Sequence, residues 1–368
     1  MSPPQPRRIG ISLGNIGALH DGLGEFALQI GQRIAAAAPR WRDRDGITFA
    51  FHLREKFVGL FGRDVNYLPV SRWHRLRHVQ PVPYALWHSL HQVNKNRPPT
   101  SCGPGGGVRV QTVHDLNYLY GPQDFTAWRQ HRRAQAIARR TDVMTAISQH
   151  TAHDVREHLG WAGEITVIPN GARSLMGAPQ EPLPGWPAAG ARPFLYHLSR
   201  MSASKNPSAI IGLARAWPEM DFVLCGPPSD EAQHLRATVQ LPNLQFHLGI
   251  SDAQKAWAYA HCAGFLFPSI TEGFGLPPLE AMHFGKPVFL SRLTSLPEVG
   301  GDAADYFDSF EPVAMRAVVQ QGLTRARQPG RAEAIRQHAA QFNWDRAANA
   351  YLALYRRLLQ LPDEPPPG

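Results

Sequence analysis

The chain has 368 residues, of which 43% are hydrophobic and 18% charged, values typical of a globular protein long enough to form two domains. No apolar run of about 18 residues occurs, and the Pro-rich start lacks the apolar segment of a signal peptide, which argues against a spanning helix and against secretion. The three cysteines, Cys102, Cys225 and Cys262, lack metal-ligand spacing, so we expect neither a zinc site nor disulfides. A cytoplasmic location fits this pattern best.

The net charge of +9 is concentrated in the first half of the chain. Residues 1–180 contain 22 Lys and Arg against 12 Asp and Glu, whereas residues 181–368 contain 16 against 17. Two basic clusters lie next to Trp73 and Trp128, and such a combination can bind the anionic inner face of the plasma membrane. A solvated arginine-rich face is the alternative, and nucleic acid is disfavoured because no nucleic-acid-binding motif accompanies the charge. The clusters are residues 72–78 and the set Arg129, Arg132, Arg133, Arg139 and Arg140.

Short apolar runs alternate with helical patterns in the first half, which is typical of a parallel α/β sheet. The predicted strands are residues 8–13, 47–53, 108–113, 142–146 and 165–168. The predicted helices are residues 24–37, 126–139 and 149–159. The segment Asp43-Arg-Asp45 has the Asp-x-Asp pattern of some metal sites, but it lies far in the sequence from the other candidate site residues. We therefore interpret it as a surface turn.

A Pro-rich segment then divides the chain, and the alternation starts again. The expected divisions are an N-terminal Rossmann-like domain 1–177, a linker 178–193, a C-terminal Rossmann-like domain 194–343, a final helix 344–361 and a disordered tail 362–368. The predicted strands of the second half are residues 194–198, 222–225, 244–248, 264–267 and 287–290. The fold class is therefore α/β with two doubly wound domains.

Charged residues follow two predicted strands of the second half. Arg200 and Lys205 come after one strand, where ligands of open α/β sheets bind, and they suit a diphosphate. Glu272 is expected at the end of another strand. Glu280 is expected in the first turns of the next helix, because Pro277 and Pro278 suit a helix start. Glycines between the two glutamates expose backbone N–H groups near a helix N-terminus, so we expect a nucleotide-sugar site.

The stretch from Ser269 to Glu280 resembles the Glu-x7-Glu motif of retaining glycosyltransferases of the GT-B fold, family 4. The segment with Arg200 and Lys205 resembles the family's diphosphate-binding segment. Other segments match in order and spacing, namely Val167-Ile-Pro-Asn170-Gly171, Leu296-Pro-Glu298-Val and Phe342-Asn-Trp344. The resemblance implies two domains that face each other across a cleft, and a last helix that crosses back to the first domain.

The resemblance also implies roles for individual residues. His114 would contact the transferred sugar in catalysis together with Arg200, Lys205 and Glu272, and Asp115 would contact the acceptor. The donor site would comprise Gly22, Gly24, Arg200, Lys205, Ile250, Glu272, Gly273, Phe274, Gly275, Leu276 and Glu280. No metal or other cofactor is expected, since the cations would stabilise the leaving diphosphate.

The expected function is transfer of a sugar, with mannose from GDP-mannose as the first choice. The acceptor would be a glycan or a lipid-linked glycan in bacterial surface polysaccharide or lipopolysaccharide synthesis. A UDP-sugar-dependent transferase of the same family is the alternative. A nucleotide-sugar epimerase and a sugar-phosphate phosphorylase of the same fold are further alternatives, although no motif for a pyridoxal-binding lysine occurs. A half-match of Gly22-Leu-Gly24 to a dinucleotide fingerprint is discounted, because the preceding loop is too long.

Overall fold

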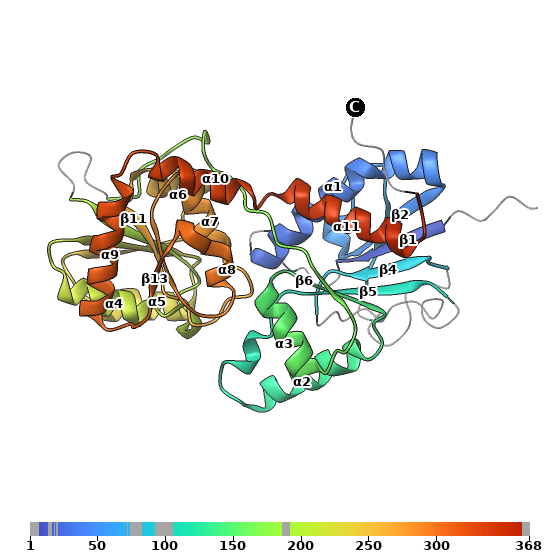
Figure 1. Ribbon diagram of the computed structural model, residues 1–368, viewed down its shortest axis with the longest axis horizontal. Helices are drawn as coiled ribbons and strands as arrows, with labels where there is room; N and C mark the ends of the chain where they lie inside the picture. Colours follow the sequence, from blue (N-terminus) through green and yellow to red (C-terminus); the bar gives the residue numbers. More distant parts are fainter. Residues whose placement is uncertain are drawn as a thin grey trace, which may run out of the picture. The chain divides into compact units, whose positions relative to one another are not determined.

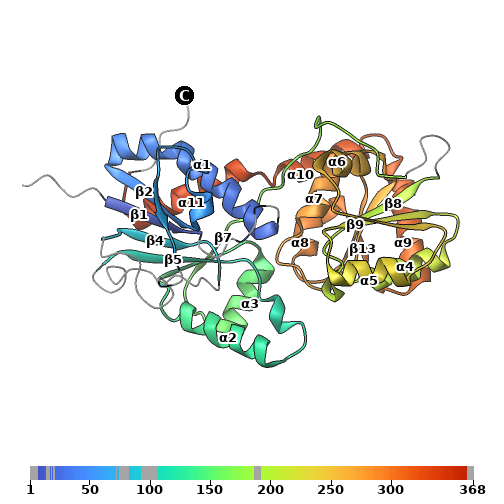
Figure 2. The same cartoon turned by 180° about the vertical axis from the view of Figure 1, so that it is seen from behind.

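The computed structural model describes residues 7–13, 17, 19, 21–71, 73, 83–92, 106–185 and 192–362. The chain forms two compact units. The first comprises Met1–Gly171 and Trp344–Gly368, and the second comprises Ala172–Asn343. Each unit is a parallel sheet with helices on both faces, which is the doubly wound α/β class (Figures 1 and 2).

The first unit contains a seven-stranded sheet of order β3-β2-β1-β4-β5-β6-β7. The strands are β1 (Arg7–Ser12), β2 (Ile47–Leu53), β3 (Asn66–Pro69), β4 (Leu86–Ser89), β5 (Val108–Val113), β6 (Val143–Ala146) and β7 (Ile165–Val167). The helices are α1 (Gly22–Asp45), α2 (Phe125–Ala138), α3 (Gln149–Leu159) and α11 (Trp344–Leu358), with the 3-10 turns η1 (Glu55–Phe57) and η3 (Asn117–Leu119). Both views place α1 and α11 on one side of the sheet and α2 and α3 on the other (Figures 1 and 2).

The second unit contains a six-stranded sheet of order β10-β9-β8-β11-β12-β13. The strands are β8 (Phe194–Leu198), β9 (Asp221–Gly226), β10 (Leu244–Leu248), β11 (Gly264–Phe267), β12 (Val288–Ser291) and β13 (Asp305–Phe307). The helices are α4 (Pro207–Ala216), α5 (Asp230–Thr238), α6 (Asp252–His261), α7 (Leu276–His283), α8 (Leu296–Gly300), α9 (Pro312–Ala326) and α10 (Arg331–Ala340), with the 3-10 turns η4 (Ala203–Lys205) and η5 (Gly301–Ala303).

The core of the second unit explains why its helices form two layers. Aliphatic residues of α4 and α9, such as Ile210, Leu213 and Val319, pack on one face of the sheet with Phe222. On the other face, Tyr196 of β8 meets the ring of Tyr259 of α6 edge-on at 5.1 Å between ring centroids. Apolar side chains thus cover both faces of the sheet, as parallel sheets buried on both sides require.

Several element boundaries differ from the sequence prediction. The helix predicted for residues 24–37 begins at Gly22 and continues through Pro39 to Asp45, because Trp41 is fully buried and holds the last turns against the unit. The interpretation of Asp45 as part of a surface turn is wrong. Its side chain is 7% exposed and accepts a hydrogen bond from Arg356 of α11 at 2.8 Å.

Strands β3, β4 and β13 were not predicted. The division between the units falls at Gly171 and Ala172, ahead of the predicted linker, and α11 belongs to the first unit. The linker residues 186–191, the tail 363–368 and all of the basic segment 72–78 except Trp73 lie outside the described residues. Within the described part of the chain, no helix is both long and apolar enough to span a membrane.

Candidate functional site

The strand order of the second unit marks the place where a ligand would bind. If the strands are numbered from 1 to 6 within the unit, starting at β8, their order in the sheet is 3-2-1-4-5-6. From β8 the chain continues toward one edge of the sheet, and from the neighbouring β11 it continues toward the other. The carboxyl ends of parallel strands lie at one edge, and ligands of such sheets bind where the order reverses. The loop after β8 carries Arg200 and Lys205, and the loop after β11 carries Glu272. The sequence-predicted residues therefore follow the two strands that flank the reversal.

An ion pair joins these two loops. Lys205 Nζ donates to Glu272 Oε1 at 2.6 Å, and the two side chains are 20% and 10% exposed. The backbone adds a second link, since Ile270 N–H donates to Ser204 O at 2.7 Å. Glu272 lies five positions beyond the last residue of β11, so the prediction that it ends the strand was wrong. A cation and a carboxylate side by side can bind a phosphate and a sugar hydroxyl of one ligand.

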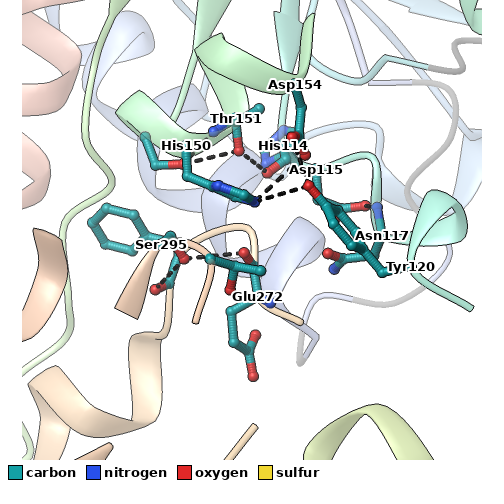
Figure 3. A network of polar contacts seen from close by, with 12 residues as sticks. His114, Asp115, Asn117, Tyr120, His150, Thr151, Asp154, Glu272 and Ser295 are labelled. Carbon is teal, nitrogen blue, oxygen red and sulfur yellow. Dashed lines mark hydrogen bonds and ion pairs between the residues drawn. The ribbon is translucent and has the colours of Figure 1, made fainter. Parts of the chain in front are cut away.

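The backbone around Glu272 is fixed by two hydroxyl residues that the sequence analysis did not identify. The backbone N–H of Glu272 donates to Thr294 Oγ1 at 3.0 Å. Ser295 Oγ is within 3.0 Å of the carbonyl oxygens of both Glu272 and Phe274, to which it donates (Figure 3). Both hydroxyl residues immediately precede the segment Leu296-Pro-Glu298. Since that segment matches the family pattern, its position could have indicated that Thr294 and Ser295 lie near the site.

A buried histidine holds the loop after β8. His197 Nδ1 bonds to Leu266 O at 2.8 Å, and because a carbonyl only accepts, Nδ1 carries the proton. His197 Nε2, at 2.7 Å from Ser199 Oγ, is then the acceptor. Ser199 Oγ in turn accepts the N–H of Met201, whose φ is +59°. Burial lowers the pKa of His197 to about 4, so the imidazole stays neutral. This chain of bonds determines where the Arg200 and Lys205 loop leaves the sheet.

The predicted glycine-rich turn leads into α7. Gly275 is the N-cap residue of this helix, with φ of +115° and no side-chain cap bond. A Cβ at this position would lie 2.8 Å from Leu296 Cδ2. Pro277 and Pro278 occupy the first turn, and Glu280 follows within the helix, as predicted. Tyr259 OH donates to Glu280 Oε2 at 2.8 Å, which orients this carboxylate.

The remaining predicted donor residues of the second unit lie around the same sheet edge. Arg200 is exposed, two residues beyond β8. Gly273, Phe274 and Gly275 are buried, and Leu276 is half-buried at the start of α7. Ile250 is half-buried after β10, and the preceding glycine has a φ of +73° and donates its N–H to Gly226 O.

In the first unit, His114 lies at the carboxyl end of β5 and is 4% exposed. His114 Nε2 donates to Leu90 O at 2.8 Å, which leaves Nδ1 as the acceptor nitrogen. The ring of Phe26 meets it edge-on at 4.5 Å between centroids. Burial lowers the pKa of His114 to about 4, so at neutral pH it can accept but not supply a second proton.

The backbone on both sides of His114 is also fixed. Gln92 Oε1 accepts the N–H of His114 at 3.2 Å. Thr151 Oγ1 donates to the carbonyl of His114 at 3.2 Å (Figure 3). Asp115 Oδ1 accepts the N–H of Asn117 at 3.1 Å, so this carboxylate organises its own loop. Its predicted contact with the acceptor stays a prediction.

Next to these residues is a cluster that the sequence analysis missed. Tyr120 OH donates to Asp154 Oδ1 at 2.6 Å, and His150 Nε2 lies 3.5 Å from Asp154 Oδ2 (Figure 3). Asp154 is 2% exposed. His150 and Asp154 are one helical turn apart in α3, a spacing that could have indicated the pair.

The predicted glycine loop of the first unit begins α1. Asp21 caps the helix, with Oδ1 accepting the N–H of Gly24 at 2.8 Å. Gly22 is exposed, with open space where a Cβ would be, whereas Gly24 is buried. The geometry of the first unit does not test whether Gly22 and Gly24 contact the donor, so this contact stays a prediction.

Comparison with known proteins gives two family matches. The family described as "Glycosyltransferase Family 4" matches residues 33–173, and the family described as "Glycosyl transferases group 1" matches residues 184–310. The first match lies in the first unit except for residues 172 and 173, and the second match lies wholly in the second unit.

Similar curated proteins include two from Escherichia coli. The chain is 39% identical over 121 residues to "Serotype-specific mannosyltransferase WbdA", which covers 32% of this chain and 15% of that protein. It is 39% identical over 111 residues to "O-antigen chain mannosyltransferase B", which covers 30% of this chain and 29% of the relative. The matched part is thus less than a third of either relative.

Solved structures match over almost the whole chain. Sucrose-phosphate synthase (tll1590) from Thermosynechococcus elongatus superposes with a TM-score of 0.70 at 18% identity, covering 96% of this chain and 99% of the other. Anabaena Alr3699/HepE in complex with UDP-glucose superposes with a TM-score of 0.65 at 18% identity, covering 95% and 99%. At these identities the likeness concerns the fold.

Proposed function

This chain belongs to family 4 of the GT-B glycosyltransferases, and on that premise we propose that it transfers mannose from GDP-mannose to a glycan hydroxyl with retention of the anomeric configuration. The observation that carries this proposal is the Lys205–Glu272 ion pair between the loops after β8 and β11. It brings a phosphate-binding cation and a hydroxyl-binding carboxylate together at the reversal of strand order.

The layout of the sheet edge supports a donor that lies across several strands. Adjacent strands are about 4.8 Å apart, so β10 lies about 14 Å from β11, three strands away. The base would bind near Ile250 after β10, the diphosphate near Arg200 and Lys205 after β8, and the sugar near Glu272 after β11. Glu280 would hold the ribose, with Tyr259 orienting its carboxylate.

The proposed reaction is a same-face displacement. The bond from the anomeric carbon to the diphosphate oxygen breaks, and a bond to the acceptor oxygen forms on the same face. The leaving phosphate takes the proton of the acceptor hydroxyl. Arg200 and Lys205 stabilise the charge that develops on the diphosphate, and this step requires no metal ion. Glu272 positions the sugar and does not attack it. The contact of His114, in the first unit, with the transferred sugar stays a prediction of the family resemblance.

The choice of donor and acceptor is supported by the names of relatives. Two E. coli relatives at 39% identity are called mannosyltransferases, and one of these names refers to the O-antigen chain. We therefore propose a glycan or lipid-linked glycan of a bacterial surface polysaccharide as acceptor. A UDP-sugar donor is the second candidate, since HepE, which shares the fold, is described in complex with UDP-glucose.

A panel of sugar nucleotides tests the proposal. GDP-mannose, UDP-glucose, ADP-glucose and dTDP-glucose are incubated with the protein in EDTA, and release of nucleotide is measured. We expect slow hydrolysis of GDP-mannose, abolished in Lys205→Ala. The control Lys286→Ala removes a lysine that precedes β12 and so lies at the amino edge of the same sheet. It should hydrolyse the donor normally.

Four outcomes would change the proposal. Hydrolysis of a UDP-sugar alone would replace the donor, and a requirement for a divalent ion would remove the metal-independent step. Conversion of the donor to an epimer, or phosphate-dependent release of a sugar phosphate, would indicate the epimerase or the phosphorylase instead.

A further inference from the structure

The outward face of α2 carries two exposed aromatic side chains. Phe125 is 71% exposed and Trp128 is 57% exposed, and both are among the most exposed large hydrophobic residues in the described part of the chain. Their rings are stacked, with centroids 5.5 Å apart and planes inclined by 24°. Exposure of so much aromatic surface on a folded helix indicates an interaction surface rather than a packing defect.

The same face continues as a row of arginines. Trp128, Arg129, Arg132, Arg139 and Arg140 follow Phe125 at intervals of three, four, seven, fourteen and fifteen positions, which place them on one side of a helix and its extension. All four arginines are exposed. No Asp or Glu occurs between Phe125 and Thr141, so no acidic side chain of the helix itself offsets this charge.

The opposite face of α2 shows why the aromatic pair points outward. The buried residues of the helix are Ala127, Ala134 and Ala138, of which the last two belong to the core that α2 shares with α3. Because these side chains are small, α2 can lie close to its neighbours, and no space is left for large rings on the inner face. The aromatic residues are therefore not part of the core of the unit.

We propose that this face of α2, called here the α2 stripe and made of Phe125, Trp128, Arg129, Arg132, Arg139 and Arg140, binds an anionic lipid surface. Aromatic rings are stabilised at the headgroup level of a bilayer, and each arginine near an anionic surface contributes to binding. The aromatic pair is gathered at one end of the stripe instead of alternating with the arginines. This arrangement suits shallow insertion of one helix end better than stacking along a nucleic acid strand.

The orientation of α2 gives the contact a consequence for catalysis, which rests on the proposed function. The helix follows β5, so its start lies toward the carboxyl edge of the sheet, where His114 and Asp115 are found. A membrane bound by Phe125 and Trp128 would thus lie near the edge to which we assign the acceptor, and a lipid-linked acceptor could reach it without leaving the bilayer.

Co-sedimentation of the full-length protein with vesicles tests the proposal. We expect binding to vesicles that contain phosphatidylglycerol, little binding to pure phosphatidylcholine, and a decrease as salt is raised. Phe125→Ala/Trp128→Ala and Arg129→Glu/Arg132→Glu should each weaken binding at least about tenfold. The control Arg215→Glu/Arg327→Glu reverses two exposed arginines of the second unit and should bind like the wild type.

The outcomes separate vesicle binding by the α2 stripe from binding by net charge and from dimer formation. Equal loss in the control pair would mean that net charge alone drives binding, and this would overturn the proposal. So would absence of vesicle binding, or formation of a dimer that only Phe125→Ala/Trp128→Ala abolishes in sedimentation velocity. Far-ultraviolet circular dichroism checks that the variants fold. Donor hydrolysis in solution should be the same in all of them, so a failure of the donor assay is distinguished from a failure of membrane binding.

Discussion

At the scale of single residues, the proposed function assigns both donor binding and chemistry to the ion pair of Lys205 and Glu272. Both side chains are largely withdrawn from water, so each would be costly to leave without a partner. When a donor binds, Lys205 would exchange its contact with Glu272 for one with the diphosphate, and Glu272 would contact the sugar. The charges are thus already oriented before the donor binds, which is the arrangement that electrostatic stabilisation of a leaving group requires.

Glu272→Gln tests the role of the carboxylate. The amide keeps the shape but removes the charge, so turnover of the donor should fall by about 100-fold while nucleotide affinity changes little. Single-turnover kinetics together with a titration of GDP measure the two effects separately. A fully active variant, or one that only loses GDP affinity, would contradict the role assigned to Glu272.

Because His197 is buried in its neutral form, we expect the free energy of unfolding to depend on pH. Burial lowers the pKa of His197 to about 4, below the value of about 6.5 expected in the unfolded chain. Because the unfolded state binds the proton more readily, His197 stabilises the fold above pH 6.5, and this contribution is lost as the pH falls toward 4. Between pH 7 and pH 5 the loss is about 2 kcal/mol.

The substitution His197→Asn should therefore make unfolding of the second unit less dependent on pH. Urea unfolding at pH 7 and pH 5 measures the difference, with His234→Asn, at an exposed position, as the control. If the two variants lose the same free energy between these pH values, the neutral state of His197 does not contribute as described.

The charged and glycine positions of this site could be predicted from the sequence because their residue types and spacing are unusual. Thr294, Ser295 and Ser199 could not be, since a hydroxyl residue in a loop carries no signal until its partner is known. Tyr120 and its link to α3 were missed for the same reason, because the tyrosine and the His150–Asp154 pair come from separate segments.

At the scale of elements, the turn before α7 depends on one glycine. Gly275 has a positive φ and little space beside Leu296, so Gly275→Ala should cost about 1–3 kcal/mol and reduce donor turnover. Gly330→Ala is the matched control, since Gly330 caps α10 with φ of +80° in open space. Thermal unfolding and donor hydrolysis of both variants measure the two effects. An equal loss of activity in both would show that the turn before α7 has no special role.

The packing of α11 on α1 includes a buried ion pair. Arg356 and Asp45 are 4% and 7% exposed at their side chains, and Arg356 lies over the ring of Trp41 at 5.1 Å. Asp45→Asn should cost about 3–5 kcal/mol, because it leaves the guanidinium buried without its counter-charge.

The exposed pair of Arg33 and Asp345 provides the comparison within the same two helices. Asp345→Asn should cost less than about 1 kcal/mol, since Asp345 is 77% exposed. Urea unfolding of both variants gives the two values. Similar losses would mean that burial of the Arg356–Asp45 pair does not determine its contribution.

Strands with several apolar side chains were predictable, whereas strands with few of them were missed. Strands β2, β5, β8, β10 and β11 have the predicted limits, since each contains at least three aliphatic or aromatic side chains. Strand β4 was missed because its four residues include His88, whose polarity is satisfied by Thr112 and Tyr355 from distant parts of the chain. The helix predicted to end at residue 37 continues through Pro39 to Asp45, because burial of Trp41 holds its last turns in place.

At the scale of the whole molecule, the two units share one strand order. The first six strands of the first unit repeat the order of the second, and β7 is added at one edge. The alternation of strand and helix patterns in the sequence could predict the doubly wound class, but it could not predict the number of strands. The charged residues beyond β8 and β11, to which the proposed function assigns the donor, belong to the second unit.

Calorimetric titration of GDP and UDP into the full-length protein, with Lys205→Ala and Lys286→Ala as the variant pair, tests the central claim most directly. We predict binding of GDP to the wild type and to Lys286→Ala, and a loss of at least about tenfold in Lys205→Ala, since a charge-assisted contact to phosphate contributes about 1.5–3 kcal/mol. Equal nucleotide affinity in the two variants would contradict the assignment of the donor diphosphate to the carboxyl edge of β8 and β11.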